Sequence, residues 1–309
     1  MIDGRITRPG CRRVHPDMKV FHSDAYGDTG IMFDTFAKAK TVAALLPAEG
    51  VSVEAPMPLT IDQVLRAHTP EYVSALKTGD PHELATSQGL GWSPSLLAAV
   101  TASAGGVLQA ATTALESGGA AGSLSSGLHH ARADRGQGFC TINGLAITAL
   151  LLADRGYRTL ILDFDAHCGG GTASLIANTP LISQIDVSVS AYDRYQPVGQ
   201  CHLQLADGND YLGAVTGALQ LAGEGPRPDL VLYNAGVDVH EHAGGVRGIT
   251  TDTVAEREQH TFEWCARNDL PVAWVLAGGY SSATFPASNV AHLHLSTVTA
   301  ALNAGGCRS

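Results

Sequence analysis

Two hydrophobic patterns alternate along the chain. Apolar positions at helical spacing predict helices at residues 34–46, 94–116, 143–154, 211–222, 251–268 and 291–303. Short apolar or β-branched runs between them predict strands at residues 120–124, 159–164, 185–189, 230–234 and 272–276. Because strands that alternate with helices form βαβ units, we expect an α/β fold with a mostly parallel β-sheet flanked by helices. We expect residues 1–309 to form a single domain, which is an ordinary length for one α/β domain.

Titratable side chains follow four of the predicted strands, just past their carboxyl ends. In chain order they are His129 and His130, Asp165 and His167, Asp238, and Tyr280. In parallel α/β sheets the ligand site lies off the carboxyl ends of the strands. The sequence therefore predicts that these side chains form one site at that edge of the sheet.

Asp165 and His167 are two residues apart on an extended segment, so their side chains face the same side. Together with Asp238 they form a set of two carboxylates and one imidazole that suits Zn²⁺ and leaves a coordination position open for a substrate. His240 and His242 lie beside Asp238 and are alternative ligands. A strand end with capping aspartates and a turn is the interpretation without a metal.

The remaining polar residues suit acyl chemistry. His129 and His130 have the side chains for general base and general acid catalysis. Tyr280 could donate its hydroxyl proton to the oxyanion of a tetrahedral intermediate. Together with a metal that polarises a carbonyl, the two histidines and Tyr280 are suited to hydrolysis of an amide or a related acyl bond. Packing histidines and a core tyrosine are the plain structural alternatives.

Composition narrows the function further. The chain has 19 Lys and Arg against 29 Asp and Glu, a net charge of −10, which argues against sequence-independent nucleic-acid binding and is compatible with cationic substrates. We see no apolar run of membrane-spanning length and no secretory leader, so we expect no membrane association. The six cysteines form no CxxC pair, which is typical of reduced thiols in a cytoplasmic protein.

Several ordered motifs resemble the histone deacetylase superfamily, including bacterial acetylpolyamine amidohydrolases and acetoin-utilisation-type proteins. The motifs are GLHHA at 127–131, GFCTINGLAI at 138–147, DFDAH at 163–167, AGVD at 235–238 and AGGY at 277–280. VLRAHTPEYVSAL at 64–76 resembles the family's segment before the site. The similarity runs from about Phe21 onward, and five motifs in order make it specific.

The resemblance implies an arginase–deacetylase fold and a role for each matching residue. The implied zinc ligands are Asp165, His167 and Asp238. The implied catalytic residues are His129, His130, Tyr280 and Asp163, the last supporting the first histidine. Gly138 and Phe139 match the wall of the narrow acyl tunnel, and Phe139 also suits an apolar wall on physical grounds. Asp163 and Ser188 match a site for a structural monovalent cation such as K⁺.

The chain departs from the family pattern near the site. HCGGG at 167–171 places Cys168 where the family often has a histidine, and Gly170 where it has the Asp or Asn that supports the second histidine. We therefore expect His130 to lack a carboxylate partner. The tunnel-rim segment AYDRYQPVGQ at 191–200 lacks the usual Pro-Gly-Thr-Gly, and Tyr192 and Tyr195 are the candidates to replace it. YGDTGIMFD at 26–34 replaces the N-terminal HPE-type motif.

These observations favour a zinc-dependent amidohydrolase that removes an acyl group from an acylated amine, with a small molecule as substrate. One alternative is a biosynthetic acyl-bond hydrolase that acts on another metabolite. A second is a metal-binding pseudoenzyme or sensor of the same fold, which Gly170 favours. An arginase-like enzyme with two Mn²⁺ is less favoured, because the carboxylates for a second metal are not evident. A homo-oligomer stays open.

Overall fold

The computed structural model describes residues 18–27 and 34–305, and these form an α/β structure around one eight-stranded sheet. The strand order is β2-β1-β3-β8-β7-β4-β5-β6, and every neighbouring pair is parallel. The strands are β1 Lys19–Phe21, β2 Ser52–Glu54, β3 Ala120–Ser123, β4 Thr159–Asp163, β5 Ile182–Ser188, β6 Cys201–Leu205, β7 Leu230–Asn234 and β8 Val272–Val275. The predicted α/β class and parallel sheet are confirmed, and all carboxyl ends lie at one edge.

The helices also follow the predicted order. The long ones are α1 Asp34–Leu45, α5 Leu96–Ser117, α6 Gly144–Ala153, α8 Tyr211–Glu224, α9 Thr251–Arg267 and α10 Ala287–Gly305. The short ones are α2 Ile61–Val64, α3 Pro70–Thr78, α4 His82–Ala85 and α7 Gly170–Ile176, with the 3₁₀ turns Asp24–Tyr26 and Leu46–Glu49. Strands β1, β2 and β6 and the helices α2, α3, α4 and α7, which have three to nine residues, were not predicted. Such short elements carry little periodicity of their own.

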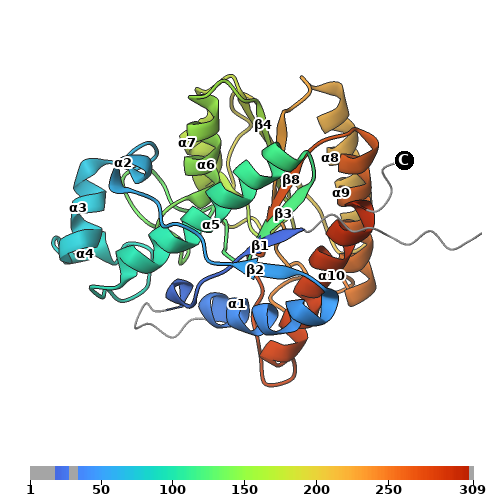
Figure 1. Cartoon of the computed structure of the whole chain (residues 1–309), viewed down its shortest axis with the longest axis horizontal. Helices are drawn as coiled ribbons and strands as arrows, with labels where there is room; N and C mark the ends of the chain where they lie inside the picture. Colours follow the sequence, from blue (N-terminus) through green and yellow to red (C-terminus); the bar gives the residue numbers. More distant parts are fainter. Residues whose placement is uncertain (1–17, 28–33, 306–309) are drawn as a thin grey trace, which may run out of the picture.

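Helices cover both faces of the sheet (Figure 1). Helices α1, α8, α9 and α10 pack on one face, and α5, α6 and α7 pack on the other. Successive residues of β4 explain this arrangement, since Leu160 and Leu162 join the first core and Ile161 joins the second. A strand buried on both faces is usually apolar along most of its length, as β4 is from Leu160 to Leu162.

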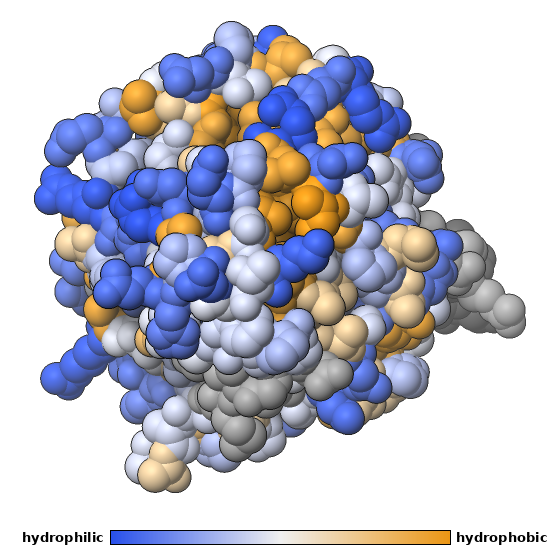
Figure 2. Space-filling model, turned by 90° about the vertical axis from the view of Figure 1, so that its left-hand side faces the viewer, coloured by the Kyte–Doolittle hydropathy of each residue, from blue (hydrophilic) through white to orange (hydrophobic). Residues whose placement is uncertain are grey.

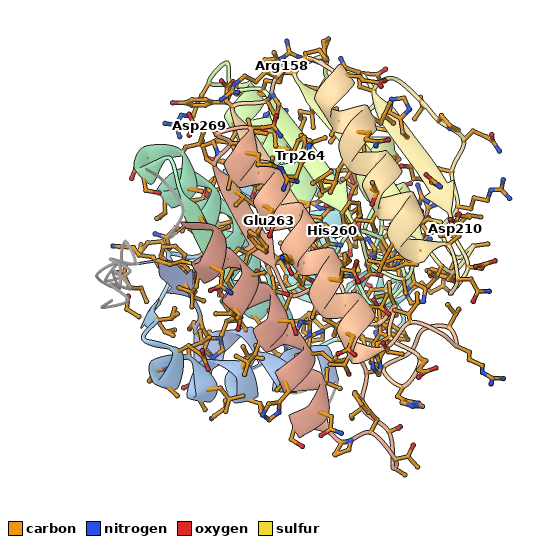
Figure 3. All side chains as sticks on the ribbon, turned by 90° about the vertical axis from the view of Figure 1, so that its right-hand side faces the viewer. Arg158, Asp210, His260, Glu263, Trp264 and Asp269 are labelled. Carbon is orange, nitrogen blue, oxygen red and sulfur yellow. The ribbon has the colours of Figure 1, made fainter. Side chains whose placement is uncertain are left out.

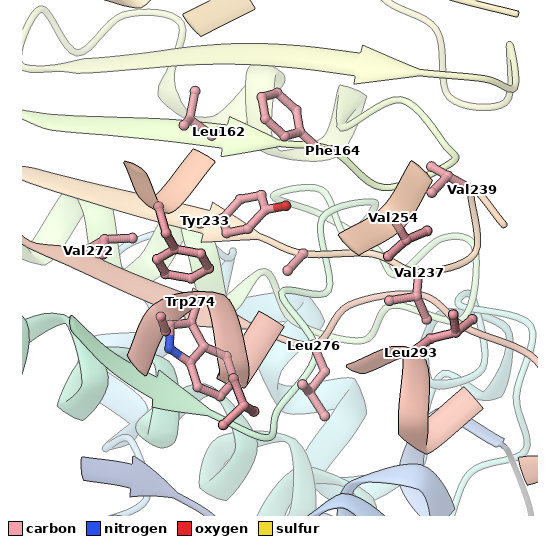
Figure 4. Close-up of a cluster of buried hydrophobic side chains, with 14 of the residues drawn as sticks. Leu162, Phe164, Tyr233, Val237, Val239, Val254, Val272, Trp274, Leu276 and Leu293 are labelled. Carbon is pink, nitrogen blue, oxygen red and sulfur yellow. The ribbon is translucent and has the colours of Figure 1, made fainter. Parts of the chain in front are cut away.

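Aromatic packing stiffens the strand ends that lead to the predicted site. Trp274, Tyr233 and Phe164 are fully buried on one face of the sheet (Figure 4). The rings of Phe164 and Tyr233 meet edge to face with centroids 5.7 Å apart. Because Phe164 directly precedes Asp165, this packing fixes the backbone from which that carboxylate projects.

Helix α9 forms part of the outer layer seen in Figure 3. Its first turn is closed by a capping box between Thr250 and Thr253. His260 and Glu263 lie on its outer side, whereas Phe262 and Arg257 are buried against the sheet. The same helix therefore shields the core and carries a buried guanidinium toward the strand ends.

One helix among the described residues reaches the length and hydropathy of a membrane span, which the sequence analysis did not expect. Helix α5 has 22 residues, and 67% of its most apolar window is buried inside the fold. A helix in the core of a globular fold can reach the same length and hydropathy, and the burial of α5 is typical of such a helix. The surface on the side of α2, α3 and α4 is mostly hydrophilic around a smaller apolar area (Figure 2).

Candidate active site

Two neighbouring strands bring together the predicted metal ligands. Asp165 and His167 follow β4, Asp238 follows β7, and the two strands pair in parallel. One ligand atom from each of these residues lies within 4.8 Å of the others. Asp165 and Asp238 are buried, and His167 is partly exposed toward the cavity described below. His240 and His242 are not in this group, because both rings lie against Phe285.

Backbone amides orient both carboxylates. Asp165 accepts hydrogen bonds from the amides of His167 and Gly278, at 3.0 and 2.9 Å. Asp238 accepts one from the amide of Ala166 at 3.1 Å through Oδ1. Its Oδ2 lies 3.1 Å from Nδ1 of His167, which is also 3.3 Å from Oδ1 of Asp165. All three side chains thus aim at one point.

The charges in this cluster are arranged for a cation. Burial, and then the charge of Asp165, raise the pKa of Asp238. Burial opposes ionisation of Asp165 too, but the charges of His129 and His167 hold its pKa well below its usual range. Although burial opposes protonation of His167, the two aspartates raise its pKa to about 11. The negative charge of two buried carboxylates thus favours a cation at this point.

The backbone around the ligands leaves room for this arrangement. A Cβ atom at Gly278 would lie 2.1 Å from Oδ2 of Asp238 and 2.6 Å from Oδ2 of Asp165. Only glycine can occupy this position while both carboxylates stay in place. We call the space that Gly278 leaves beside Asp165 and Asp238 the cradle. Together with a donor set of two carboxylates and one imidazole, it fits a Zn²⁺ ion with an open coordination position.

The first of the paired histidines is bound to a carboxylate from β4. Nδ1 of His129 lies 2.8 Å from Oδ2 of Asp163, and the other carboxylate oxygen accepts a hydrogen bond from Asn234 at 2.8 Å. Nε2 of His129 then faces the ligand cluster, 3.5 Å from Oδ1 of Asp165. Although burial opposes protonation, these two aspartates raise the pKa of His129 to about 10.

The second histidine also has a carboxylate, so the expectation that His130 lacks such a partner was wrong. Nδ1 of His130 lies 3.0 Å from Oδ2 of Asp193, in the loop between β5 and β6. Burial, and then the charge of His129, lower the pKa of His130 to about 4. Tyr192 and Tyr195 were the residues predicted to act in this segment, and the aspartate between them was missed.

A narrow cavity of about 30 Å³ opens beside the ligand cluster. Of the predicted site residues, its walls include His129, His130, Gly138, Phe139, Asp165, His167 and Tyr280. Phe139 is 44% exposed, and the ring of Tyr192 stands edge-on to His130 with centroids 5.0 Å apart. A larger groove of about 840 Å³ between α9 and α10 contains none of these residues.

The residues predicted to hold a monovalent cation lie behind the cavity. Ser188 is buried, and its hydroxyl donates to Oδ1 of Asp186 at 2.5 Å. Burial, and then the charge of Asp163, raise the pKa of Asp186 well above its usual range. Asp186 was missed because it lies within the apolar pattern of β5. The cation itself stays a prediction.

A buried arginine binds the backbone of the two loops that carry Asp165 and Asp238. The guanidinium of Arg257 donates to the carbonyl oxygens of Phe164 at 2.9 Å and Gly236 at 2.6 Å. These carbonyls come one residue before Asp165 and two residues before Asp238. This role could not be predicted from the sequence, because Arg257 lies in an amphipathic helix, where a charged residue is expected on the solvent face.

Comparison with known proteins agrees with this geometry. A family model described as Histone deacetylase domain matches residues 34–296. The chain therefore belongs to the histone deacetylase family and is a deacetylase-type hydrolase by family.

Three similar proteins illustrate the range of this family. An uncharacterized protein of Picosynechococcus sp. is 33% identical over 69% of this chain and 74% of its own length. A probable deacetylase of Methanothermobacter thermautotrophicus is 29% identical over 75% of both chains. The structure of an acetylpolyamine aminohydrolase from Burkholderia pseudomallei matches with a TM-score of 0.75 at 18% identity, covering 92% of this chain and 98% of that one. The last likeness shows the arginase–deacetylase fold.

Proposed function

We propose that this protein is a zinc-dependent amidohydrolase that removes an acyl group from a small acylated amine. The observation that carries the proposal is the meeting of three parts at one cavity. These parts are the Asp165, His167 and Asp238 cluster, two histidines that each bind a carboxylate, and Tyr280. Family membership supports the same reaction class.

Asp165, His167 and Asp238 would hold the zinc ion. When bound there, zinc polarises an acyl carbonyl and makes a water molecule more acidic. The chain's own contribution is to keep both carboxylates oriented through the amides of Gly278 and Ala166.

The two histidines carry the proton transfers. As the oxygen of a water molecule bonds to the acyl carbon, an imidazole Nε2 takes up the proton that this water loses. When the C–N bond breaks, an imidazole returns a proton to the departing nitrogen, which gives a carboxylic acid and a free amine. Asp163 and Asp193 hold the Nδ1 atoms of His129 and His130, which leaves each Nε2 for this work.

Tyr280 would stabilise the oxygen of the acyl group by a hydrogen bond. It lines the cavity together with His130 and His167, and its backbone amide is fixed by the carbonyl of Ala243 at 2.9 Å. Its hydroxyl would donate a hydrogen bond to the oxyanion as charge develops there. Removing one such donor typically costs about 10²–10³ in rate.

The cavity size supports a short acyl group. A space of about 30 Å³ bounded by Gly138 and Phe139 admits a narrow arm and leaves the rest of the substrate outside. The net charge of −10 is compatible with an amine product that carries positive charge. A metabolite hydrolase with another acylated substrate would use the same parts. The pseudoenzyme alternative loses its main support, because His130 has a carboxylate partner despite Gly170.

A substrate panel tests the proposal. The zinc-loaded protein should hydrolyse at least one free acylated amine, such as acetyl-lysine or an acetylpolyamine. We expect kcat/KM for that compound to exceed the value for an acetylated histone-tail peptide. Hydrolysis of the peptide alone would overturn the small-molecule assignment, and no hydrolysis of any N-acyl amine by a zinc-loaded sample would overturn the enzyme assignment.

A further inference from the structure

Asp193 is an unusually constrained residue for a surface loop. It lies in the segment 189–200 between β5 and β6, yet its side chain is only 1% exposed. Its backbone φ is +57°, in the left-handed region that non-glycine residues rarely adopt. A conformation of this kind persists where surrounding contacts hold it, so the contacts of its carboxylate are informative.

Both carboxylate oxygens of Asp193 are fully engaged. Oδ2 lies 3.0 Å from Nδ1 of His130 and accepts a hydrogen bond from the amide of Gly171, also at 3.0 Å. Oδ1 accepts from Gln137 at 3.1 Å and from the guanidinium of Arg132. Arg132 and Gln137 thus fix the carboxylate from behind, and its other oxygen is presented to His130.

Gly170 provides the space for this carboxylate. A Cβ atom at Gly170 would lie 2.3 Å from the backbone oxygen of Asp193 and 2.7 Å from its Oδ1. The nearest clash is with backbone, so a rotamer change cannot relieve it. Gly170 has no left-handed φ. Position 170 therefore requires glycine because there is no room for a Cβ atom, and any side chain there would displace Asp193.

We propose that Asp193 is the positioning residue of His130, brought by the loop 189–200 into the space that Gly170 leaves open. The inference rests on the proposed function, since it assigns to Asp193 the orientation of a histidine that transfers protons. Holding Nδ1 of His130 directs Nε2 into the cavity. Tyr192, whose ring stands edge-on to that of His130, belongs to the same loop, so two residues of this loop contact the imidazole.

Kinetics of the zinc-loaded enzyme provide the first test, with an N-acetylated amine that the wild type hydrolyses. Asp193→Ala should lower kcat by about 10–100-fold and leave KM within about twofold, because His130 loses its orientation while the cavity remains. Asp193→Asn keeps an acceptor oxygen and should lose less. Asp154→Asn, which removes an exposed carboxylate paired with Arg66, is the matched control and should keep wild-type kcat. An unchanged kcat in Asp193→Ala would overturn the proposal.

A substitution at position 170 provides the second test. Gly170→Ala should lower kcat by about 10–100-fold, as Asp193→Ala does, because its Cβ atom collides with the backbone oxygen of Asp193 and displaces the carboxylate from His130. Because both changes remove the same contact, Gly170→Ala combined with Asp193→Ala should cost little more than either change alone. Losses that add in full would contradict the idea that both positions serve one histidine.

A third measurement is independent of catalysis. An imidazole N–H bonded to a carboxylate gives a strongly downfield proton NMR signal, and the His130 signal is assigned by its loss in His130→Ala. That signal should disappear in Asp193→Ala, whereas the corresponding His129 signal should remain. If the His130 signal persists in Asp193→Ala, the positioning role is wrong. If it disappears and no substrate is hydrolysed by the wild type, the proposed function fails and the contact stands.

Discussion

Oδ2 of Asp238 lies 2.1 Å from the point where a side chain at Gly278 would begin. The same point is 2.6 Å from Oδ2 of Asp165, so Gly278 touches two predicted metal ligands at once. Gly278→Ala should push the carboxylates apart and weaken zinc binding by at least about tenfold. Titration of the metal-free protein with zinc, followed by calorimetry, measures this loss.

A glycine without neighbours serves as the control for that substitution. Nothing lies within 4 Å of a Cβ atom built at Gly217 in helix α8. Gly217→Ala should therefore bind zinc like the wild type and gain about 0.5–1 kcal/mol in free energy of unfolding. Equal zinc affinity in Gly278→Ala and the wild type would show that the cradle is not required.

His68 should make the fold sensitive to acid. Its ring is buried, Nε2 accepts a hydrogen bond from the amide of Asn143 at 2.9 Å, and burial lowers its pKa to about 4. The unfolded chain binds a proton at this histidine below about pH 6.5, whereas the folded chain does so only near pH 4. The stability due to the neutral ring is thus complete above pH 6.5 and is lost as the pH falls toward 4.

Urea unfolding at about pH 7.5, which lies above that window, and at about pH 5.5 and 4.5, which lie within it, measures the effect. The difference in free energy of unfolding between the wild type and His68→Gln should shrink as the pH falls, because the variant has no imidazole to titrate. His260→Gln, at a partly exposed position of α9, is the control and should follow the wild type. A difference that stays constant over this range would refute the assignment.

Arg257 should matter for both stability and metal binding. It is fully buried beside Glu258, and it also bonds the carbonyls that precede the two ligand loops. Arg257→Met should lower the free energy of unfolding by about 3–5 kcal/mol, because Glu258 is left buried without its cation. Arg257→Met combined with Glu258→Gln should recover part of this loss. A single variant within about 1 kcal/mol of the wild type would mean that the pair is dispensable.

The sequence predicted the central part of the fold well for a physical reason. Strands such as β4 and β7 are buried on both faces, so their apolar runs are unbroken and easily seen. The edge strand β2 has three residues that are all exposed, and its pairing with β1 has no signature in its own side chains. The order of strands in the sheet likewise depends on packing between distant segments.

The residues of the site also divide into those that could be predicted from the sequence and those that could not. Asp165, His167, Asp238 and Tyr280 each follow a recognisable strand, so their meeting could be predicted from the chain. Asp193 and Arg257 act from a loop and from a helix surface, and no local spacing relates them to the residues they support. The absence of a carboxylate at Gly170 suggested a weakened site, whereas the partner of His130 comes from a different strand connection.

Metal content and turnover, measured on the same purified sample, test the central claim most directly. We expect about one zinc per chain, as three protein ligands predict, and hydrolysis of an N-acetylated amine. In Tyr280→Phe the zinc content should be unchanged and kcat lower by about 10²–10³. About two manganese per chain, or a full complement of zinc without any turnover on a broad panel of acylated amines, would contradict the account.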